Sequence, residues 1–269
     1  MKQPFGGLDR EFWAKKPLIG MVHLLPLPGS PRDSGQGMEP ILERALADAK
    51  ALEAGGADAM MIENFFDAPF VKEDSPAHTL VAMTQVVLEI RKITALPLGV
   101  NVLRNDAISA LAIAHVCRAQ FVRVNVWVGA AVTDQGIIEG AARKANLYRR
   151  ELGANVAILA DIFVKHATQI GGGSLEDVAK DAALRGLADG LILSGTATGS
   201  ATSPDDLRRV KAALPDCPLL VGSGFNLASA RDLLKFADSA IVGTSLKPSG
   251  DVTQPVAASL VSALKKTMG

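Results

Sequence analysis

Short, almost wholly apolar runs alternate with longer amphipathic runs from one end of this chain to the other. The apolar runs are typical of buried β-strands, and the amphipathic runs have the spacing of helices. We expect strands at 17–23, 58–64, 97–103, 120–128, 155–164, 188–195, 217–224 and 237–245. We expect helices at 39–54, 76–93, 105–117 and 136–152, and four more beginning at Ser174, Ser203, Asn226 and about Gln254.

These runs make eight strand–helix units in 269 residues, with no Pro/Ser-rich linker between them. Eight units of this size predict an α/β fold, a closed (β/α)8 TIM barrel. We expect one domain over residues 1–269, with a short N-terminal extension to about residue 16. A doubly wound open sheet is the alternative, but no G-x-G-x-x-G follows the first strand and no Walker loop is present.

Composition narrows the function classes. The 28 Lys+Arg balance the 28 Asp+Glu and aromatics are only 4%, so a nucleic-acid partner is not expected. No stretch reaches the roughly 18 apolar residues of a spanning helix, and charges interrupt the N-terminus where a signal peptide is apolar. We therefore expect a cytoplasmic protein without a transmembrane segment, in which Cys117 and Cys217 are reduced thiols.

Ionisable residues interrupt the apolar strands near their carboxyl ends, where such barrels bind their ligands. A charge placed there is costly unless it is paired or used. The candidate catalytic residues are His23, Glu63, Asp161 and Lys165. Each also has a structural interpretation, and Lys165 is either a Schiff-base nucleophile or a solvated loop residue. Arg123 is expected to form a structural ion pair with Glu63 or Asp161.

A second group of polar residues at the strand ends is predicted to bind substrate: Asn101, Arg104, Asn125, His166, Ser194 and Thr196. Asn101 and Asn125 occupy matching places in the echoing segments GVNV and RVNV. Either both amides point at one ligand or they bridge backbone groups at the barrel end.

The last two strands end in small residues, Gly222-Ser223-Gly224 and Gly243-Thr244-Ser245. Small residues let backbone N–H groups approach an anion, and a helix beginning at Asn226 would add its positive end. We therefore predict a phosphate site here; the alternative is that the glycines only make tight turns.

Metal binding stays open. His23, Glu63, Asp161 and His166 could converge, but the spacing matches no zinc motif. A divalent cation held partly by a substrate phosphate would leave little trace, so no cofactor is assigned.

Several segments together resemble the BtpA/SgcQ family: GMVHLLPLPGSPR, IENFFDAPF, LPLGVNVLRNDA, QFVRVNV, KHAT, KDAALRGLADGLILSGTATG, PLLVGSGFN and AIVGTSLK. The resemblance covers nearly the whole chain and implies a barrel of the phosphate-binding type. The family is named for a cyanobacterial member required for photosystem I accumulation and found peripherally at thylakoid membranes, while other members occur beside sugar-metabolism genes. The resemblance supplies no catalytic role residue by residue.

Three functions are consistent with these features. The first is an enzyme, of isomerase or aldolase/lyase type, acting on a small phosphorylated metabolite such as a sugar phosphate or a nucleoside-derived phosphate. The second is a non-catalytic factor that stabilises membrane proteins through peripheral contact, for which the C-terminal VAASLVSALKKTMG is the candidate surface. The third is a non-catalytic subunit. A homo-oligomer is expected and is compatible with all three.

Overall fold

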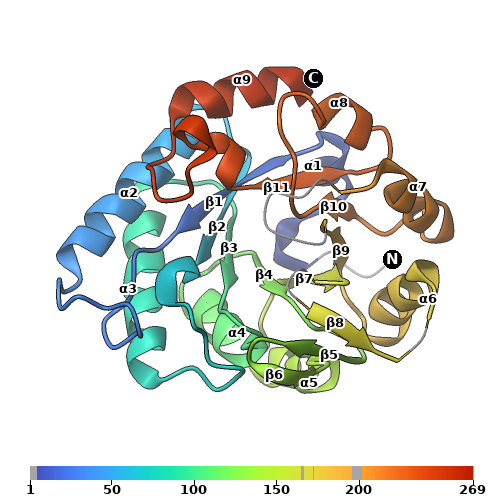
Figure 1. Cartoon of the computed structure of the whole chain (residues 1–269), viewed down its shortest axis with the longest axis horizontal. Helices are drawn as coiled ribbons and strands as arrows, with labels where there is room; N and C mark the ends of the chain where they lie inside the picture. The colour runs from blue at the N-terminus through green and yellow to red at the C-terminus, as the bar shows by residue number, and fades with distance from the viewer. Residues whose placement is uncertain (1–4, 165–166, 172, 196–201, 269) are drawn as a thin grey trace.

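The structure is a computed structural model that describes residues 5–164, 167–171, 173–195 and 202–268. Within these residues eight parallel strands close into a barrel, in the order β1-β11-β10-β9-β7-β4-β3-β2. Figure 1 looks along this barrel, with the helices arranged around the strands. The predicted TIM barrel is confirmed, and the open-sheet alternative is excluded by the pairing of β1 with β11.

The barrel strands are β1 (Leu18–His23), β2 (Ala59–Glu63), β3 (Leu98–Asn101), β4 (Phe121–Val124), β7 (Ala157–Ile162), β9 (Gly190–Leu193), β10 (Leu219–Val221) and β11 (Ser239–Val242). The surrounding helices are α2 (Glu39–Ala54), α3 (Ala77–Ile93), α4 (Ala107–Val116), α5 (Ala142–Glu151), α6 (Leu175–Lys180), α7 (Pro204–Ala213), α8 (Ala230–Leu233) and α9 (Ala258–Met268). A π-helical turn, η3 (Asp181–Arg185), continues α6.

The strands are apolar on both faces because one face fills the barrel and the other meets the helices. The interior cluster includes Ile19, Met61 and Leu159, whereas neighbouring residues of the same strands pack against the helices. Close approach inside the barrel explains one glycine: a Cβ at Gly99 would lie 2.1 Å from the ring of Phe121. The phenyl ring therefore occupies the space that a side chain on β3 would fill.

The N-terminal segment packs against the barrel interior. A short helix, α1 (Arg10–Ala14), is capped by Asp9, whose carboxylate accepts the N–H of Phe12. Leu8 is buried with the interior cluster, and the rings of Phe12 and Trp13 pack against it. This segment thus extends the core beyond the strands.

The predicted helix at 136–152 is wrong at its start. Residues 130–139 form a hairpin, β5 (Ala130–Thr133) with β6 (Gly136–Glu139), and α5 begins only at Ala142. A third strand, β8 (Ala167–Ile170), pairs with β5 and was not predicted. β4 also ends at Val124 rather than at 128. The hairpin turns at Gly136, whose φ of 90° favours glycine and interrupts any helix.

The predicted helix at Asn226 is also wrong. Asn226 instead closes a turn, in which its carboxamide oxygen accepts the N–H groups of Ala228 and Ser229. α8 begins at Ala230 and has 4 residues, so it offers no extended helix end to a ligand. By contrast, the predicted helix starts at Ser174 and Ser203 are confirmed, because each hydroxyl caps its helix by accepting the N–H three residues on.

None of the helices in the described part of the chain combines the length and apolar character that a bilayer crossing requires. Cys117 and Cys217 are free thiols, as expected. Burial raises the pKa of Cys117 to about 11 and that of Cys217 to about 12. Burial therefore favours the protonated thiol over the thiolate at both positions.

Candidate active site

Polar side chains replace apolar ones where the inward-facing rows of the strands reach their carboxyl ends. On β1, His23 stands two residues after the interior residue Met21. In the sheet register His23 lies beside Glu63, and Glu63 lies beside Asn101. Because side chains alternate along a strand, these three polar groups form the top of the barrel interior.

His23 and Glu63 form a buried pair. The imidazole Nε2 lies 3.7 Å from a carboxylate oxygen of Glu63, and both residues are about 6% exposed. The Asn101 carboxamide donates a hydrogen bond to the other oxygen of Glu63. The ring of Phe65 stacks on the imidazole, with centroids 4.3 Å apart. A carboxylate and an imidazole in this arrangement are a suitable pair for proton exchange.

His23 also contacts the residues that follow β11, the other strand paired with β1. A Cβ at Gly243 would lie 2.8 Å from Cε1 of His23, so only glycine permits this contact. The imidazole therefore bridges from β2 to the small residues that follow β11.

A second carboxylate, Asp161, is fully engaged. Nε and Nη2 of Arg123 each donate to one of its oxygens at 2.9 Å, and Nδ2 of Asn125 donates at 2.8 Å. The predicted ion pair of Arg123 is confirmed, with Asp161 as its partner. Burial opposes the charge of Arg123, but the attraction of Asp161 outweighs it and raises the pKa of the guanidinium. Oδ1 of Asn125 makes no hydrogen bond with another described residue.

Arg104 links the two carboxylate clusters electrostatically. It is buried, and this burial lowers the pKa of its guanidinium, while Asp161, Asp134 and Glu63 oppose the shift by attraction. Asp134 belongs to the turn between β5 and β6. The hairpin that sequence patterning missed therefore places a carboxylate within electrostatic reach of the barrel mouth.

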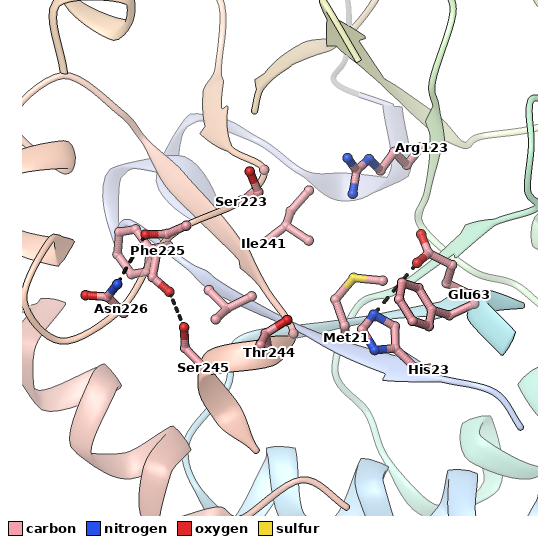
Figure 2. A pocket seen from close by; sticks show the side chains of 15 residues that line it. Met21, His23, Glu63, Arg123, Ser223, Phe225, Asn226, Ile241, Thr244 and Ser245 are labelled. Atoms are coloured by element: carbon pink, nitrogen blue, oxygen red, sulfur yellow. Dashed lines mark hydrogen bonds and ion pairs between the residues drawn. The ribbon is translucent and has the colours of Figure 1, made fainter. Parts of the chain in front are cut away.

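A cavity of about 160 Å³ lies between His23 and the loops after β10 and β11. Figure 2 shows His23 and Glu63 on one side of it and Ser223, Thr244 and Ser245 on the other. Its lining residues are Met21, His23, Glu63, Phe65, Arg123, Gly222–Asn226 and Ile241–Ser245. One cavity thus joins the His23–Glu63 pair to the glycine-containing loops.

The loops after β10 and β11 carry backbone donors that are still open. The N–H groups of Gly224, Thr244 and Ser245 make no hydrogen bond with other described residues. The N–H of Gly222 does not belong to this set, because it donates to the Leu193 carbonyl at 2.8 Å. The predicted contribution of Gly222 as a donor is therefore wrong.

Two hydroxyls hold these loops in place. Ser245 Oγ donates to the Phe225 carbonyl at 2.7 Å and so joins the loop after β11 to the loop after β10. Ser223 Oγ accepts the N–H of Gly195 at 3.0 Å and joins the loop after β9. The open N–H groups are therefore carried by a cross-linked backbone.

Three predicted site residues, Lys165, His166 and Thr196, lie outside the described residues. Ser194 is described, and it packs so closely that a Cβ at Gly222 would lie 2.3 Å from its hydroxyl oxygen. Within the described ranges, no cluster of His, Cys, Asp and Glu has the arrangement of a metal site.

Sequence reasoning missed Phe65 and Asp67, which follow Glu63 in the segment ENFFD. The available signal was an aromatic pair and an acid placed directly after a buried strand. A short 3-10 turn, η2 (Phe65–Asp67), brings Phe65 back over His23.

The chain is 46% identical over 261 residues to the photosystem I biogenesis protein BtpA of Synechocystis, covering 97% of this chain and 91% of that protein. It is 31% identical to the putative sgc region protein SgcQ of Escherichia coli, covering 88% of each. Among solved structures, thiamine phosphate pyrophosphorylase from Pyrococcus furiosus superimposes with a TM-score of 0.59 at 18% identity. That alignment covers 96% of this chain and 97% of the other, and it shows a shared barrel fold.

The BtpA family model matches residues 14–269, from the end of α1 through α9. The predicted resemblance is thereby confirmed, and the chain belongs to the BtpA family.

Proposed function

We propose that this protein is an enzyme that acts on a small phosphorylated metabolite, a sugar phosphate or a nucleoside-derived phosphate, by an isomerase or aldolase/lyase reaction. One observation carries the proposal. A single cavity has the His23–Glu63 pair on one side and the open N–H groups of the loops after β10 and β11 on the other.

The phosphate binds at the open N–H groups of Gly224, Thr244 and Ser245. Backbone donors held in a fixed arrangement bind an anion without needing a side-chain cation. Among the described residues that line the cavity, Arg123 is the one arginine or lysine, and it already holds Asp161. The related solved barrel is named for a phosphorylated compound, which supports the same assignment by analogy of fold.

The reacting carbon lies close to the phosphate. Because Gly243 contacts His23, and His23 lies 3.7 Å from Glu63, only a short substrate spans the two sides. In an isomerase step Glu63 takes a proton from the carbon beside a carbonyl, and His23 protonates the carbonyl oxygen. Glu63 then gives the proton to the former carbonyl carbon while His23 takes the proton of the neighbouring hydroxyl, which becomes the new carbonyl. Both groups regain their starting protonation states, so the step needs no co-reactant.

The other predicted site residues take supporting roles. Asn101 orients the Glu63 carboxylate through its hydrogen bond. Asp161 holds Arg123 in the cavity wall rather than exchanging protons itself. The buried Oδ1 of Asn125 accepts a substrate hydroxyl, since a buried acceptor is stabilised by finding a donor.

Thermal unfolding with a panel of phosphosugars tests the proposal. A ligand that binds only the native state at 100 times its Kd stabilises it by about 2.7 kcal/mol. We expect at least one phosphosugar to raise the Tm of the wild type and of T244S, and its unphosphorylated parent sugar to have no effect. T244E places a carboxylate among the donors and is expected to lose the shift. An unchanged Tm with every phosphorylated compound contradicts the proposal.

The alternative is a factor that stabilises membrane proteins, as the name of the Synechocystis relative suggests for that protein. The candidate surface for it, α9, is already used within the fold. Val261 and Leu264 are buried, and Lys265 forms an ion pair with Asp58. Flotation with anionic liposomes separates the two functions. An enzyme without a membrane role is expected to stay in the fraction that contains no liposomes, whereas flotation of the protein with the liposomes favours the alternative.

A further inference from the structure

Two buried side chains join three loops at the barrel mouth. Asn64 Oδ1 accepts the N–H of Leu103 at 2.8 Å, and Asn64 Nδ2 donates to Oδ2 of Asp67 at 3.1 Å. Oδ1 of Asp67 accepts the N–H of Leu27 at 2.8 Å. Asn64 is 2% exposed and Asp67 is 5% exposed, so water competes little for these bonds. The loops after β1, β2 and β3 are therefore fixed relative to one another.

Each joined loop follows or contains residues of the candidate site. The loop after β1 directly follows His23, and the loop after β2 directly follows Glu63. Leu103, in the loop after β3, lies between Asn101 and Arg104. Displacing any of these loops would change the geometry around the His23–Glu63 pair.

The main chain at Asp67 belongs to the turn that carries Phe65 onto the imidazole. The N–H of Asp67 donates to the Asn64 carbonyl at 3.2 Å and closes the turn η2. Phe65, the first residue of η2, stacks on His23 at 4.3 Å with an interplanar angle of 21°. A connected path therefore runs from Asp67 through η2 and Phe65 to His23.

Burying the carboxylate of Asp67 costs solvation free energy, and an apolar residue would avoid that cost. Burial raises the pKa of Asp67, while the hydrogen bonds from Leu27 and Asn64 and the attraction of His78 act in the opposite direction. A cavity of about 180 Å³ borders Asn64, Asp67 and Leu103, so apolar packing alone does not fix these loops. The hydrogen bonds that Asp67 makes between the loops, rather than core packing, account for a buried acid here.

We infer that Asp67 is a positioning residue, which fixes the imidazole of His23 by holding η2 and the loops after β1 and β3. The inference rests on the proposed function, in which His23 exchanges protons with the substrate. Asp67 itself touches no part of the cavity that would hold the substrate: it is absent from the residues that line it.

The imidazole signals of His23 test this in solution. The chain has 4 histidines, so the Cε1–H signal is assigned readily by NMR with a His23→Gln variant. The ring current of Phe65 displaces this signal, and F65L supplies its position without stacking. We expect D67A to move the His23 signal toward its position in F65L.

The matched control is D33A in the loop after β1. Asp33 accepts the N–H groups of Gly29 and Gly35, so its removal, like that of Asp67, deletes two hydrogen bonds to a carboxylate but leaves η2 intact. We expect the His23 signal of D33A to stay at its wild-type position. If D67A leaves the signal where D33A leaves it, the inference is overturned.

A second variant covers the case in which D67A does not fold. D67N keeps an acceptor for Leu27 but presents an amide donor to Nδ2 of Asn64, so it is expected to move the signal less and in the same direction. An unmoved signal in folded D67N also overturns the inference. The phosphosugar panel on the wild type is independent of both: its failure removes the proposed function but leaves the His23 signals to decide the positioning role.

Discussion

On the β4–β7 side of the barrel mouth (Arg123, Asn125 and Asp161), every carboxylate oxygen is held by a side-chain donor at 2.8–2.9 Å. On the β10–β11 side (Gly222–Asn226 and Gly243–Ser245) there is no charged side chain, and backbone N–H groups stay open within the described residues. The first side neutralises its own buried charge. The second is neutral and offers donors, and this is the side suited to an anionic guest.

A buried cation behind the β10–β11 side extends the contrast. Lys247 is 1% exposed, and its ammonium donates to the Val252 carbonyl at 2.9 Å. Burial lowers its pKa to about 8, against the attraction of Asp48. Arg123, facing a carboxylate directly, instead has a raised pKa. Burial thus opposes both positive charges, and only the contact of Arg123 with a carboxylate outweighs it.

The largest expected effect comes from breaking the ion pair. D161A leaves the Arg123 guanidinium buried without its partner, which typically lowers the free energy of unfolding by about 3–5 kcal/mol. Urea unfolding monitored by circular dichroism measures the loss. A change no larger than that of a surface substitution would show that the pair does not hold this side together.

Replacing both charges sharpens the same comparison. In R123M/D161L an apolar pair fills the site, and such replacements are often neutral or stabilising because no charge is left buried. We expect the double variant to recover most of the stability that D161A loses. If the double variant instead loses as much stability as R123M and D161A lose in sum, the arginine and the aspartate act independently.

The pH dependence of stability separates Lys247 from Arg123. The folded pKa of Lys247 is about 8, below its ordinary value of 10.5, so between these values the unfolded chain binds more protons. Stability from this group therefore rises as pH rises through that interval. We expect urea unfolding of the wild type to show this rise relative to K247M, whose other titrations are the same. Parallel pH profiles for the two proteins would refute the burial of an ionising lysine here.

The smallest effect is expected from the hydroxyl bridge on the β10–β11 side. S245A removes the hydrogen bond to the Phe225 carbonyl and is expected to cost about 1 kcal/mol of unfolding free energy. It is also expected to weaken phosphosugar binding, because the two loops lose their link. T244S retains the hydroxyl and serves as the control; equal binding by S245A and T244S would argue against the link.

Local patterning predicted the barrel because its signal repeats in every unit. Each strand is apolar on both faces, and alternation along it places His23 and Glu63 on the inward rows. Local patterning did not predict the hairpin at 130–139. Its strands pair with each other and with β8, and only part of that pairing is local in sequence. The helix predicted at Asn226 is wrong because Asx turns and helix starts favour the same residues.

Partner choice within the site required the register of the strands. The sequence predicts either Glu63 or Asp161 as the ion-pair partner of Arg123. Only the placement of β4 beside β7 selects Asp161. Asn101 and Asn125 looked like two amides for one ligand, yet each donates to a carboxylate of a neighbouring strand. Such contacts depend on which strands become neighbours, and short-range periodicity does not specify that.

The central claim is that the open amides of the β10–β11 side receive phosphate, and amide NMR during a titration with inorganic phosphate tests it most directly. The account predicts that the Gly224, Thr244 and Ser245 resonances move together and saturate, while the N–H of Gly222, bonded to Leu193, moves least among its neighbours. Saturating shifts confined to other parts of the chain, or no shift at these three amides, would contradict it.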